Sequence, residues 1–261
     1  MAAFSPPPVQ SDRMQERLRR FTHVPNFTGY MAVVADFVLG AGRPGLEILD
    51  MPAGNGLLAE YLRQRGCKVV CGDINAERPD YVPVNMEKRL PFEDSSFDAV
   101  ICLEGIEHVI DPCCLIREIC RVLRPDGFVV LSTPNVQSLY SRLKFLFTGT
   151  FYQFEPAGHR RPGASLADRG HVSPLSLVQL DYLFGEFGLV PQKVTGDRIK
   201  KKILFPIYLA LWSFNVLALW ARKRRSSRDD VTRLYALLTD FRPMMSRSLI
   251  TVWGRPGHGG R

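Results

Sequence analysis

The sequence lacks several features that would each assign it to a specialised class. It has six cysteines, and none of them falls in the paired spacing of a zinc site. No charged start followed by an apolar run marks a secretory leader, and no internal repeat or heptad pattern is present. These absences favour an ordinary globular protein of a reducing, cytoplasmic compartment, in which the cysteines serve as small buried side chains.

Acidic residues are missing from one long segment. Between Arg198 and Arg228 there are nine basic residues and no acidic one. The whole chain of 261 residues has 34 Lys and Arg against 26 Asp and Glu, so its remainder is close to neutral. Because the net charge of +8 belongs to this one segment, the sequence does not predict a basic face for nucleic acid.

Short apolar runs alternate regularly with helical patterns along most of the chain. Alternating strands and helices build a parallel sheet that is covered on both faces, so the sequence predicts an α/β fold with a doubly wound sheet. The runs typical of buried strands are 46–51, 68–72, 81–84, 97–103, 128–132, 189–195 and 248–253.

Helix signals divide the chain further. A capping-box pattern predicts a helix at 12–21, and apolar spacing predicts a second at 29–39. Asp111 before Pro112 marks a helix start in the middle of the chain, and Ser173 before Pro174 predicts another. We expect four parts: a tail with covering helices (1–45), a core (46–197) with a lid at about 136–172, an inserted hydrophobic element (198–242), and a last strand with a tail (243–261).

A buried strand runs into a glycine-containing turn at 47–56. Gly54 and Gly56 allow the backbone to approach a ligand closely, and the start of the following helix favours a carboxylate or phosphate. One strand later, Asp73 ends a strand, where its carboxylate can accept hydrogen bonds from both hydroxyls of a ribose. Each such charged hydrogen bond contributes roughly 1.5–3 kcal/mol. The pair of features predicts a site for an adenosine-containing cofactor.

Two cofactors fit this turn. Gly54-x-Gly56-x-x-Ala59 matches the dinucleotide fingerprint in its Ala form, which indicates NAD. Asp50, four residues before Gly54, fits a different pattern. The segment resembles motif I of class I S-adenosylmethionine-dependent methyltransferases, and Pro52 stands where that family has its first glycine.

The resemblance continues over roughly residues 46–135. The segment 85–98 resembles the family's block of an acid, Leu-Pro-Phe and Phe-Asp, and 104–109, 121–127 and 131–135 follow in the family's order. The greatest likeness is to the ubiquinone-biosynthesis O-methyltransferase group, which is methyltransferase type 11-like. This resemblance implies a Rossmann-like, seven-stranded sheet with a final antiparallel strand, and S-adenosylmethionine as the cofactor.

The resemblance also implies which residues bind the cofactor. Asp50 would act on the amino group, Asp73 on the ribose, and Asn85 would accept a hydrogen bond from the adenine amino group. Met86 would cover the adenine ring, with ordinary core packing as the alternative. The complete predicted set is Asp50, Ala53, Gly54, Gly56, Asp73, Ile74, Asn85, Met86 and Glu104.

Three polar residues, Glu104, Glu107 and His108, directly follow the fourth predicted strand, at the sheet edge where ligands bind. A hydroxyl acceptor must lose its proton, and histidine is best suited to take it near neutral pH. We therefore predict His108 as the base, with helix capping as the alternative, and place Glu107 and His171 in the catalytic set. The same trio after the strand is acceptable for Mg²⁺ but not diagnostic, so a metal is left open.

Residues 203–220 contain no charge. As a helix they would reach roughly 27 Å, just short of a bilayer core of about 30 Å. Because the strands predicted on either side belong to one sheet, the chain must return to the side that it left, and 229–241 is too short and charged to cross back. Basic clusters on both flanks suit an anionic surface, so we expect residues 198–228 to lie on a membrane. A helix packed on the domain or in a dimer interface is the alternative.

These features predict a peripheral protein on the inner face of a membrane that methylates a hydroxyl of a small or lipid-linked acceptor. A methyltransferase-like membrane adaptor that binds the cofactor weakly or not at all is one alternative, and an NAD-dependent oxidoreductase is another. The sequence does not identify the acceptor.

Overall fold

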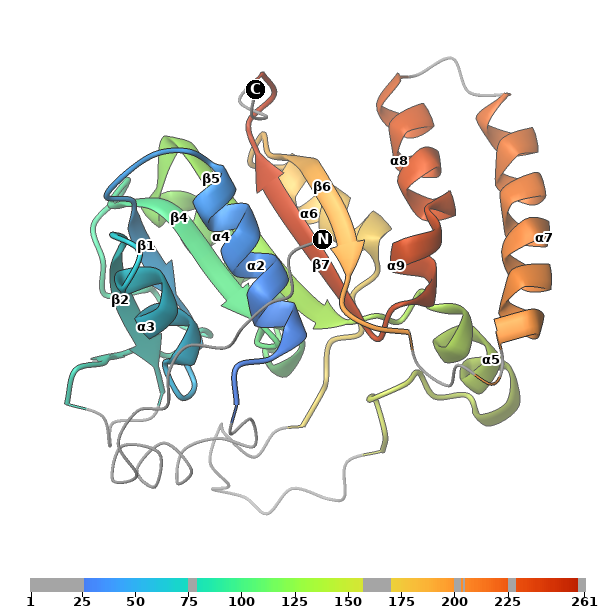
Figure 1. Ribbon diagram of the computed structural model, residues 1–261, viewed down its shortest axis with the longest axis horizontal. Coiled ribbons are helices and arrows are strands. Elements are labelled where there is room, and N and C mark those ends of the chain that lie inside the picture. Colours follow the sequence, from blue (N-terminus) through green and yellow to red (C-terminus); the bar gives the residue numbers. More distant parts are fainter. Residues whose placement is uncertain are drawn as a thin grey trace.

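Seven strands form a single sheet in the order β3-β2-β1-β4-β5-β7-β6 (Figure 1). The computed structural model describes residues 26–74, 79–156, 170–199, 203, 205–224 and 229–257. Neighbouring strands from β3 to β5 are parallel, and β7 runs antiparallel to both β5 and β6. This confirms the predicted fold. The strands are β1 (Glu47–Asp50), β2 (Lys68–Asp73), β3 (Val82–Pro83), β4 (Phe97–Leu103), β5 (Leu123–Pro134), β6 (Val190–Gly196) and β7 (Ser248–Gly254).

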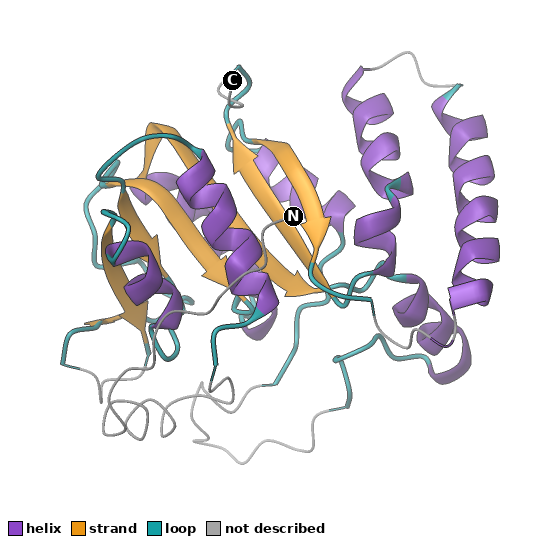
Figure 2. Cartoon of the chain, viewed as in Figure 1, coloured by secondary structure: helices purple, strands orange, loops and turns teal. Residues whose placement is uncertain are grey.

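Helices cover both faces of the sheet (Figure 2). Side chains alternate along β4, so that Val100 and Cys102 enter one core cluster with α4, while Ala99 and Ile101 enter the other with α2 and α3. The helices are α2 (Gly29–Gly40), α3 (Leu57–Arg63), the 3₁₀ turn η1 (Ile106–His108), α4 (Pro112–Val122), α5 (Leu139–Thr148), α6 (Leu177–Gly185), α7 (Phe205–Lys223), α8 (Asp229–Thr239) and α9 (Phe241–Met245). The predicted helix at 12–21 lies outside the described residues.

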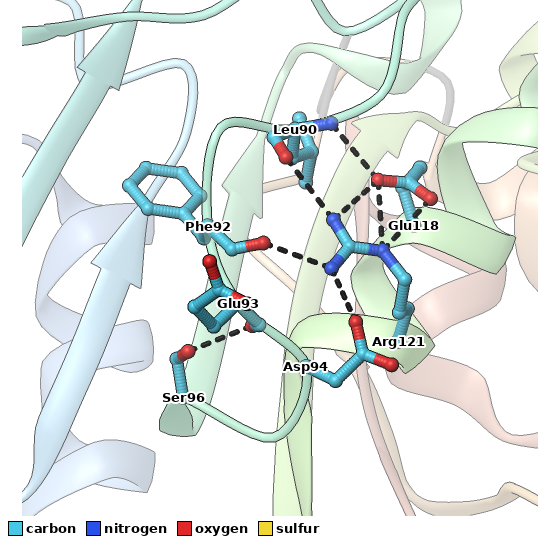
Figure 3. A network of polar contacts seen from close by, with 7 residues as sticks. All are labelled: Leu90, Phe92, Glu93, Asp94, Ser96, Glu118 and Arg121. Atoms are coloured by element: carbon cyan, nitrogen blue, oxygen red, sulfur yellow. Dashed lines mark hydrogen bonds and ion pairs between the residues drawn. The ribbon is translucent and has the colours of Figure 1, made fainter.

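The C-terminal turn of α4 holds the loop between β3 and β4 (Figure 3). The Arg121 guanidinium donates to the carboxylates of Glu118 and Asp94, at 2.6 and 2.7 Å, and to the carbonyls of Leu90 and Phe92. The Leu90 amide donates in turn to Glu118, at 2.9 Å. Because the guanidinium fork is planar and rigid, these bonds set the path of the loop.

The prediction that Ser173 and Pro174 start a helix is wrong. Helix α6 begins at Leu177, where the side chains of Ser176 and Gln179 form a reciprocal capping box. Ser173 instead donates its amide to the Glu107 carbonyl, at 3.0 Å, and its hydroxyl to the Val109 carbonyl, at 2.6 Å. The capping box satisfies the free amides at the start of α6, so the helix begins there and not at the earlier serine.

Helices α7 and α8 form a hairpin beside the edge strand β6 (Figure 1). Leu234, Leu237 and Leu238 of α8 pack against the main core. The Trp212 indole of α7 donates to the Thr239 carbonyl, at 2.9 Å, yet Tyr208 is the one α7 side chain that is buried among those whose exposure is described. None of the helices in the described ranges is both long enough and apolar enough to cross a membrane.

Candidate functional site

A cleft with a volume of about 180 Å³, open to solvent, lies at the carboxyl ends of β1 and β4. Since β1 stands between β2 and β4, this is the point where the strand order reverses, which is the usual ligand position in such sheets. The lining residues come from both strand ends, the glycine turn and the two helices above it. They are Tyr30, Met31, Asp50, Pro52, Ala53, Gly54, Asn55, Leu58, Leu103 and Glu104.

The glycine turn is fastened to the end of β2. Gly54 and Gly56 have φ angles of +54° and +74°, in the left-handed region that favours glycine. The Gly54 amide donates to Asp73 Oδ2, at 2.9 Å, and the Tyr81 hydroxyl donates to the Gly54 carbonyl, at 3.2 Å. The turn and the acid at the end of β2 therefore form one unit.

Pro52, which departs from the family pattern, packs against Gly105 just after β4. A β-carbon on Gly105 would lie 2.5 Å from the Pro52 ring. No side chain fits in that space, so the glycine makes room for the proline. The turn keeps its place beside β4 in spite of the departure.

The structure brings some of the predicted cofactor residues together and separates others. Asp50, Ala53, Gly54 and Glu104 line the cleft. Five predicted residues are not among the lining residues: Gly56, Asp73, Ile74, Asn85 and Met86. Asp73 is joined to the cleft through its bond to Gly54, and Gly56 precedes the first residue of α3.

The remaining three come shortly after the ends of β2 and β3. Ile74 is 45% exposed and stays free to pack beside a ligand. The Asn85 side-chain oxygen accepts from the Glu87 amide, at 2.9 Å, so it stabilises its own loop. Met86 packs against the main core cluster, which is the alternative that the sequence left open.

The acids of the cleft are poorly solvated. Burial raises the pKa of Asp50 to about 7, the nearby charge of Asp73 adds to this effect, and Arg63 opposes it. Burial also raises the pKa of Glu104, although the Arg247 charge and a hydrogen bond from the Ser132 hydroxyl, at 3.0 Å, favour its ionised form. A cationic group of a ligand would relieve the repulsion between Asp50 and Asp73.

The three predicted catalytic residues lie close together, just after Glu104 in the chain and at His171. One ligand atom from each of Glu107, His108 and His171 lies within 4.8 Å of the others. The rings of His108 and His171 meet edge to face, with centroids 4.7 Å apart, and Phe154 packs 5.5 Å from His171. The predicted catalytic set is thus a real cluster in space. Within the described ranges, Glu107, His108 and His171 are the group that could hold a metal ion. The sequence suggested Glu104 in place of His171, and Glu104 does not belong to this group.

The protonation of this cluster follows from its contacts. His108 Nδ1 lies 2.9 Å from the Gly170 carbonyl oxygen. Because a carbonyl can only accept, Nδ1 carries the hydrogen and Nε2 keeps its lone pair. Burial lowers the pKa of His108 and that of His171, so both rings are neutral near neutral pH.

Glu107 is completely buried. Burial and the charge of Glu104 raise its pKa well above the usual range. Among the described residues, neither carboxylate oxygen has a hydrogen-bond partner of normal geometry, although the Thr133 hydroxyl is near. Its backbone carbonyl accepts from the amides of Val172 and Ser173. Glu107 therefore also holds in place the segment that carries His171.

The sequence did not predict that residues of α2 line the cleft. Tyr30 and Met31 at the start of α2 line it, as do Asn55 and Leu58. Burial and the charges of Glu104 and Asp50 raise the pKa of the Tyr30 phenol, which places its ring beside both acids. The apolar spacing of 29–39 indicated a covering helix, but no local signal shows which part of a sheet a helix covers.

Comparison with known proteins bears on this geometry. Residues 20–194 match the model of a family described as a methyltransferase domain. A ubiquinone biosynthesis O-methyltransferase of Neisseria meningitidis serogroup A is 34% identical over an alignment of 107 residues, and the match covers 35% of this chain and 45% of that protein. The same-named protein of Pseudomonas aeruginosa strain UCBPP-PA14 is 36% identical over 110 residues, 36% of this chain and 47% of its own. The chain spans about half the length of the curated relatives that it matches.

Solved structures share the fold at low identity. A SAM-dependent methyltransferase from Archaeoglobus fulgidus superposes with a TM-score of 0.51 at 14% identity, over 85% of this chain and 93% of that one. The Burkholderia thailandensis 1,6-didemethyltoxoflavin-N1-methyltransferase, solved with bound S-adenosylhomocysteine, gives 0.50 at 12% identity, over 87% and 76%. Since the family model covers most of its length, the chain belongs to the methyltransferase domain family.

Proposed function

We propose that this protein transfers the methyl group of S-adenosylmethionine to a hydroxyl of an acceptor at a membrane surface. The observation that carries the proposal is the cleft at the strand-order reversal, where Asp50, the Gly54 turn and Asp73 meet. When bound, S-adenosylmethionine supplies a methyl group that is already activated by its sulfonium. The family favours this cofactor over NAD.

The residues present fit this cofactor. Asp50 is 3% exposed, and its burial, together with the nearby negative charge of Asp73, raises its pKa to about 7. An ammonium group beside it would supply the missing positive charge. Asp73 stands at the end of β2, beside the glycine turn that it bonds, and a carboxylate oxygen can accept from ribose hydroxyls.

His108 would act on the acceptor. Its Nε2 lone pair would take the proton of an acceptor hydroxyl as the oxygen forms the new bond to the methyl carbon. The bond from that carbon to the sulfonium sulfur would break in the same step, and S-adenosylhomocysteine would leave. The His171 ring packs against the His108 ring and the Phe154 ring packs against His171, and these rings would shield the reacting groups from water. Alignment of the oxygen with the methyl carbon is then the main contribution of the protein.

Exposed apolar side chains on α7 and α5 support the membrane part of the proposal. Phe214 and Leu217 of α7 are 71% and 63% exposed, and Leu146 and Phe147 at the end of α5 are 73% and 80% exposed. Helices α5 and α7 are in contact, so these side chains belong to adjoining elements. A surface of this kind marks an interaction site.

Charge favours a membrane over a second copy of the chain as the partner. Arg198 before α7 and Arg222 near its end are exposed, and Arg224 stacks its guanidinium 3.8 Å over the Trp220 ring. Each cation near an anionic bilayer contributes about 1 kcal/mol. In a symmetric dimer interface the same cations would come close to one another.

Two measurements test the proposal. Isothermal titration should show binding of S-adenosylhomocysteine and none of NAD, and a protein that binds neither would be the adaptor instead. Transfer of labelled methyl from S-adenosylmethionine into a membrane lipid extract tests the reaction. A chelator tests the metal separately. Methyl transfer that is unchanged in excess EDTA would exclude a metal from the mechanism. Activity that EDTA removes and Mg²⁺ restores would support a metal ion at the Glu107–His108–His171 cluster.

Vesicle flotation tests the membrane surface. The wild-type protein should float with anionic vesicles, and Phe214→Ser with Leu217→Ser should abolish flotation. Tyr182→Ser on α6 is the matched control, because Tyr182 is an aromatic residue with 73% exposure on another helix. If the double variant floats as well as the control, the membrane contact does not involve α7.

A further inference from the structure

Glu104 has a backbone conformation that is unusual for a residue with a side chain. It directly follows β4, and its φ angle is +49°, in the left-handed region that favours glycine. Such a conformation destabilises a fold and persists where the surrounding contacts enforce it, most often at functional sites. The strain at Glu104 therefore indicates that the position of its side chain matters for function.

Contacts with Ser132 of β5 enforce this conformation. The Glu104 amide donates to the Ser132 carbonyl, at 3.0 Å, and to the Ser132 hydroxyl oxygen, at 3.2 Å. The Ser132 hydroxyl donates in turn to Glu104 Oε1, at 3.0 Å. Ser132 is itself buried. The backbone and the carboxylate of Glu104 are thus both fixed, in the cleft that Glu104 lines.

The protein gives the Glu104 carboxylate no counter-ion of its own. None of the described residues forms an ion pair with it. Arg247, whose charge acts on Glu104, is already paired with Asp197, at 3.1 Å. A poorly solvated carboxylate is stabilised by a cation. A positively charged ligand in the cleft would supply one.

Tyr30 of α2 lines the same cleft together with Glu104 and Asp50. Burial raises the pKa of the Tyr30 phenol, and the charges of Glu104 and Asp50 add to this effect, which places the phenol near both acids. The face of an aromatic ring attracts a cation within about 6 Å. The cleft therefore combines two carboxylates with an aromatic ring, a set that suits a ligand with two positive charges.

S-adenosylmethionine carries two positive charges, an ammonium group and, further along the same chain, a sulfonium. The charge of Glu104 also acts on Glu107, which lies in one cluster with His108. Because the methyl group on the sulfonium has to face His108 for transfer, the sulfonium belongs at the Glu104 end of the cleft. The ammonium group is then left for Asp50, as proposed above.

We infer that Glu104, with the Tyr30 ring beside it, binds the sulfonium charge, so that the cleft holds S-adenosylmethionine more tightly than S-adenosylhomocysteine. The inference rests on the proposed function and assigns to its cofactor site a preference between cofactor and product. After transfer the sulfur is a neutral thioether. The product keeps the contact with Asp50 and loses the one with Glu104, which favours its release.

Isothermal titration with three ligands, in the absence of an acceptor, tests this inference. They are S-adenosylmethionine, S-adenosylhomocysteine and sinefungin, in which a carbon that carries a protonated amine replaces the methylated sulfur. The wild-type protein should bind the two ligands with the additional charge at least about tenfold more tightly than S-adenosylhomocysteine, which corresponds to 1.4 kcal/mol.

Variants at Glu104 and Tyr30 locate this preference. Glu104→Gln should remove the preference and leave the affinity for S-adenosylhomocysteine nearly unchanged, because its side-chain oxygen can still accept from Ser132. Tyr30→Phe keeps the ring and should keep the preference, whereas Tyr30→Leu should reduce it. A preference that Glu104→Gln retains in full overturns the inference.

Asp50→Asn is the matched control, because it removes the other acid that lines the cleft. It should weaken all three ligands by a similar factor, since each of them carries the ammonium group. If Asp50→Asn removes the preference and Glu104→Gln does not, the sulfonium lies at Asp50 and the inference is wrong.

The wild-type comparison requires no variant, so it does not depend on how well a variant folds. Equal binding of the three ligands by the wild-type protein overturns this inference and leaves the proposed function intact. Failure to bind any of the three contradicts the proposed function itself.

Discussion

Helix α4 packs on the sheet, whereas α7 packs on α5, α8 and α9, and the apolar residues of the two helices have opposite fates. In α4, Leu115, Ile116, Ile119 and Val122 lie on one stripe and are all buried. In α7 the apolar residues surround the helix, so that one neighbouring layer covers only part of them. The comparison teaches that the distribution of apolar residues around a helix, and not their number, decides whether the fold alone can bury them.

The polar contacts of α4 join it to the loops of the sheet, whereas those of α7 join it to the neighbouring helix α8. Asp111 caps α4 by accepting from the Cys114 amide, at 3.0 Å, and Arg121 joins its end to the loop after β3. Helix α7 is held by the Trp212 and Asn215 side chains, which bond to carbonyls of α8. One helix is therefore built into the catalytic domain, and the other faces outward.

The largest expected effect lies at the catalytic edge that α4 follows. His108→Ala should lower methyl transfer into the lipid extract by about 10²–10⁴-fold, because the proton acceptor is removed. Affinity for S-adenosylhomocysteine should change little, since His108 does not line the cofactor cleft. A parallel loss of cofactor binding and turnover would show that His108 supports the structure instead.

A pair of truncations tests the comparison directly. Ile116→Ala in α4 removes a side chain with 0% exposure and should lower the free energy of unfolding by about 2–5 kcal/mol. Leu217→Ala in α7 removes one with 63% exposure and should change it by less than about 0.5 kcal/mol. Urea denaturation measures both. Similar losses would mean that α7 is covered by the protein itself.

Asp73→Ala should weaken binding of S-adenosylhomocysteine at least about tenfold, or 1.4 kcal/mol, because the proposed ribose contact is lost. Asp73→Asn is the control, since its side-chain oxygen can still accept from the Gly54 amide. If Asp73→Asn keeps the wild-type affinity while Asp73→Ala loses it, the role of Asp73 is to hold the turn. Unchanged affinity in a folded Ala variant would show that the ribose assignment is wrong.

The smallest effect is a pH dependence at Asp50. Its pKa, raised from 3.8 to about 7, means that the folded protein holds a proton that the unfolded chain releases. The stability contributed by this proton is present at low pH and is lost as pH rises through 7. A bound ammonium group favours the charged form, so affinity for S-adenosylhomocysteine should fall about threefold between pH 7.5 and 6.5.

Titration at both pH values measures this change. Asp50→Asn should bind more weakly and lose the pH dependence. A wild-type affinity that stays constant over this range would mean that Asp50 is already ionised without ligand, or that no cation binds beside it.

The strand pattern and the glycine turn could be predicted from the sequence because their signals are local. Strands buried on both faces are continuous apolar runs, and a turn that needs left-handed backbone carries glycine, as at Gly54 and Gly56. The Asp50 and Asp73 acids follow from the same strands, since each stands at a strand end.

Only the tertiary structure decided which of these residues face one another. Glu104 turns to Ser132 and the cleft, whereas His108 meets His171 and the Gly170 carbonyl, 62 residues away in the chain. The sequence shows the apolar character of residues 203–220 directly. Which side of α7 packs on α8 and which side stays exposed depends on the hairpin of the two helices. Contacts between distant segments are set by how helices pack on the sheet, and local residue patterns do not encode that packing.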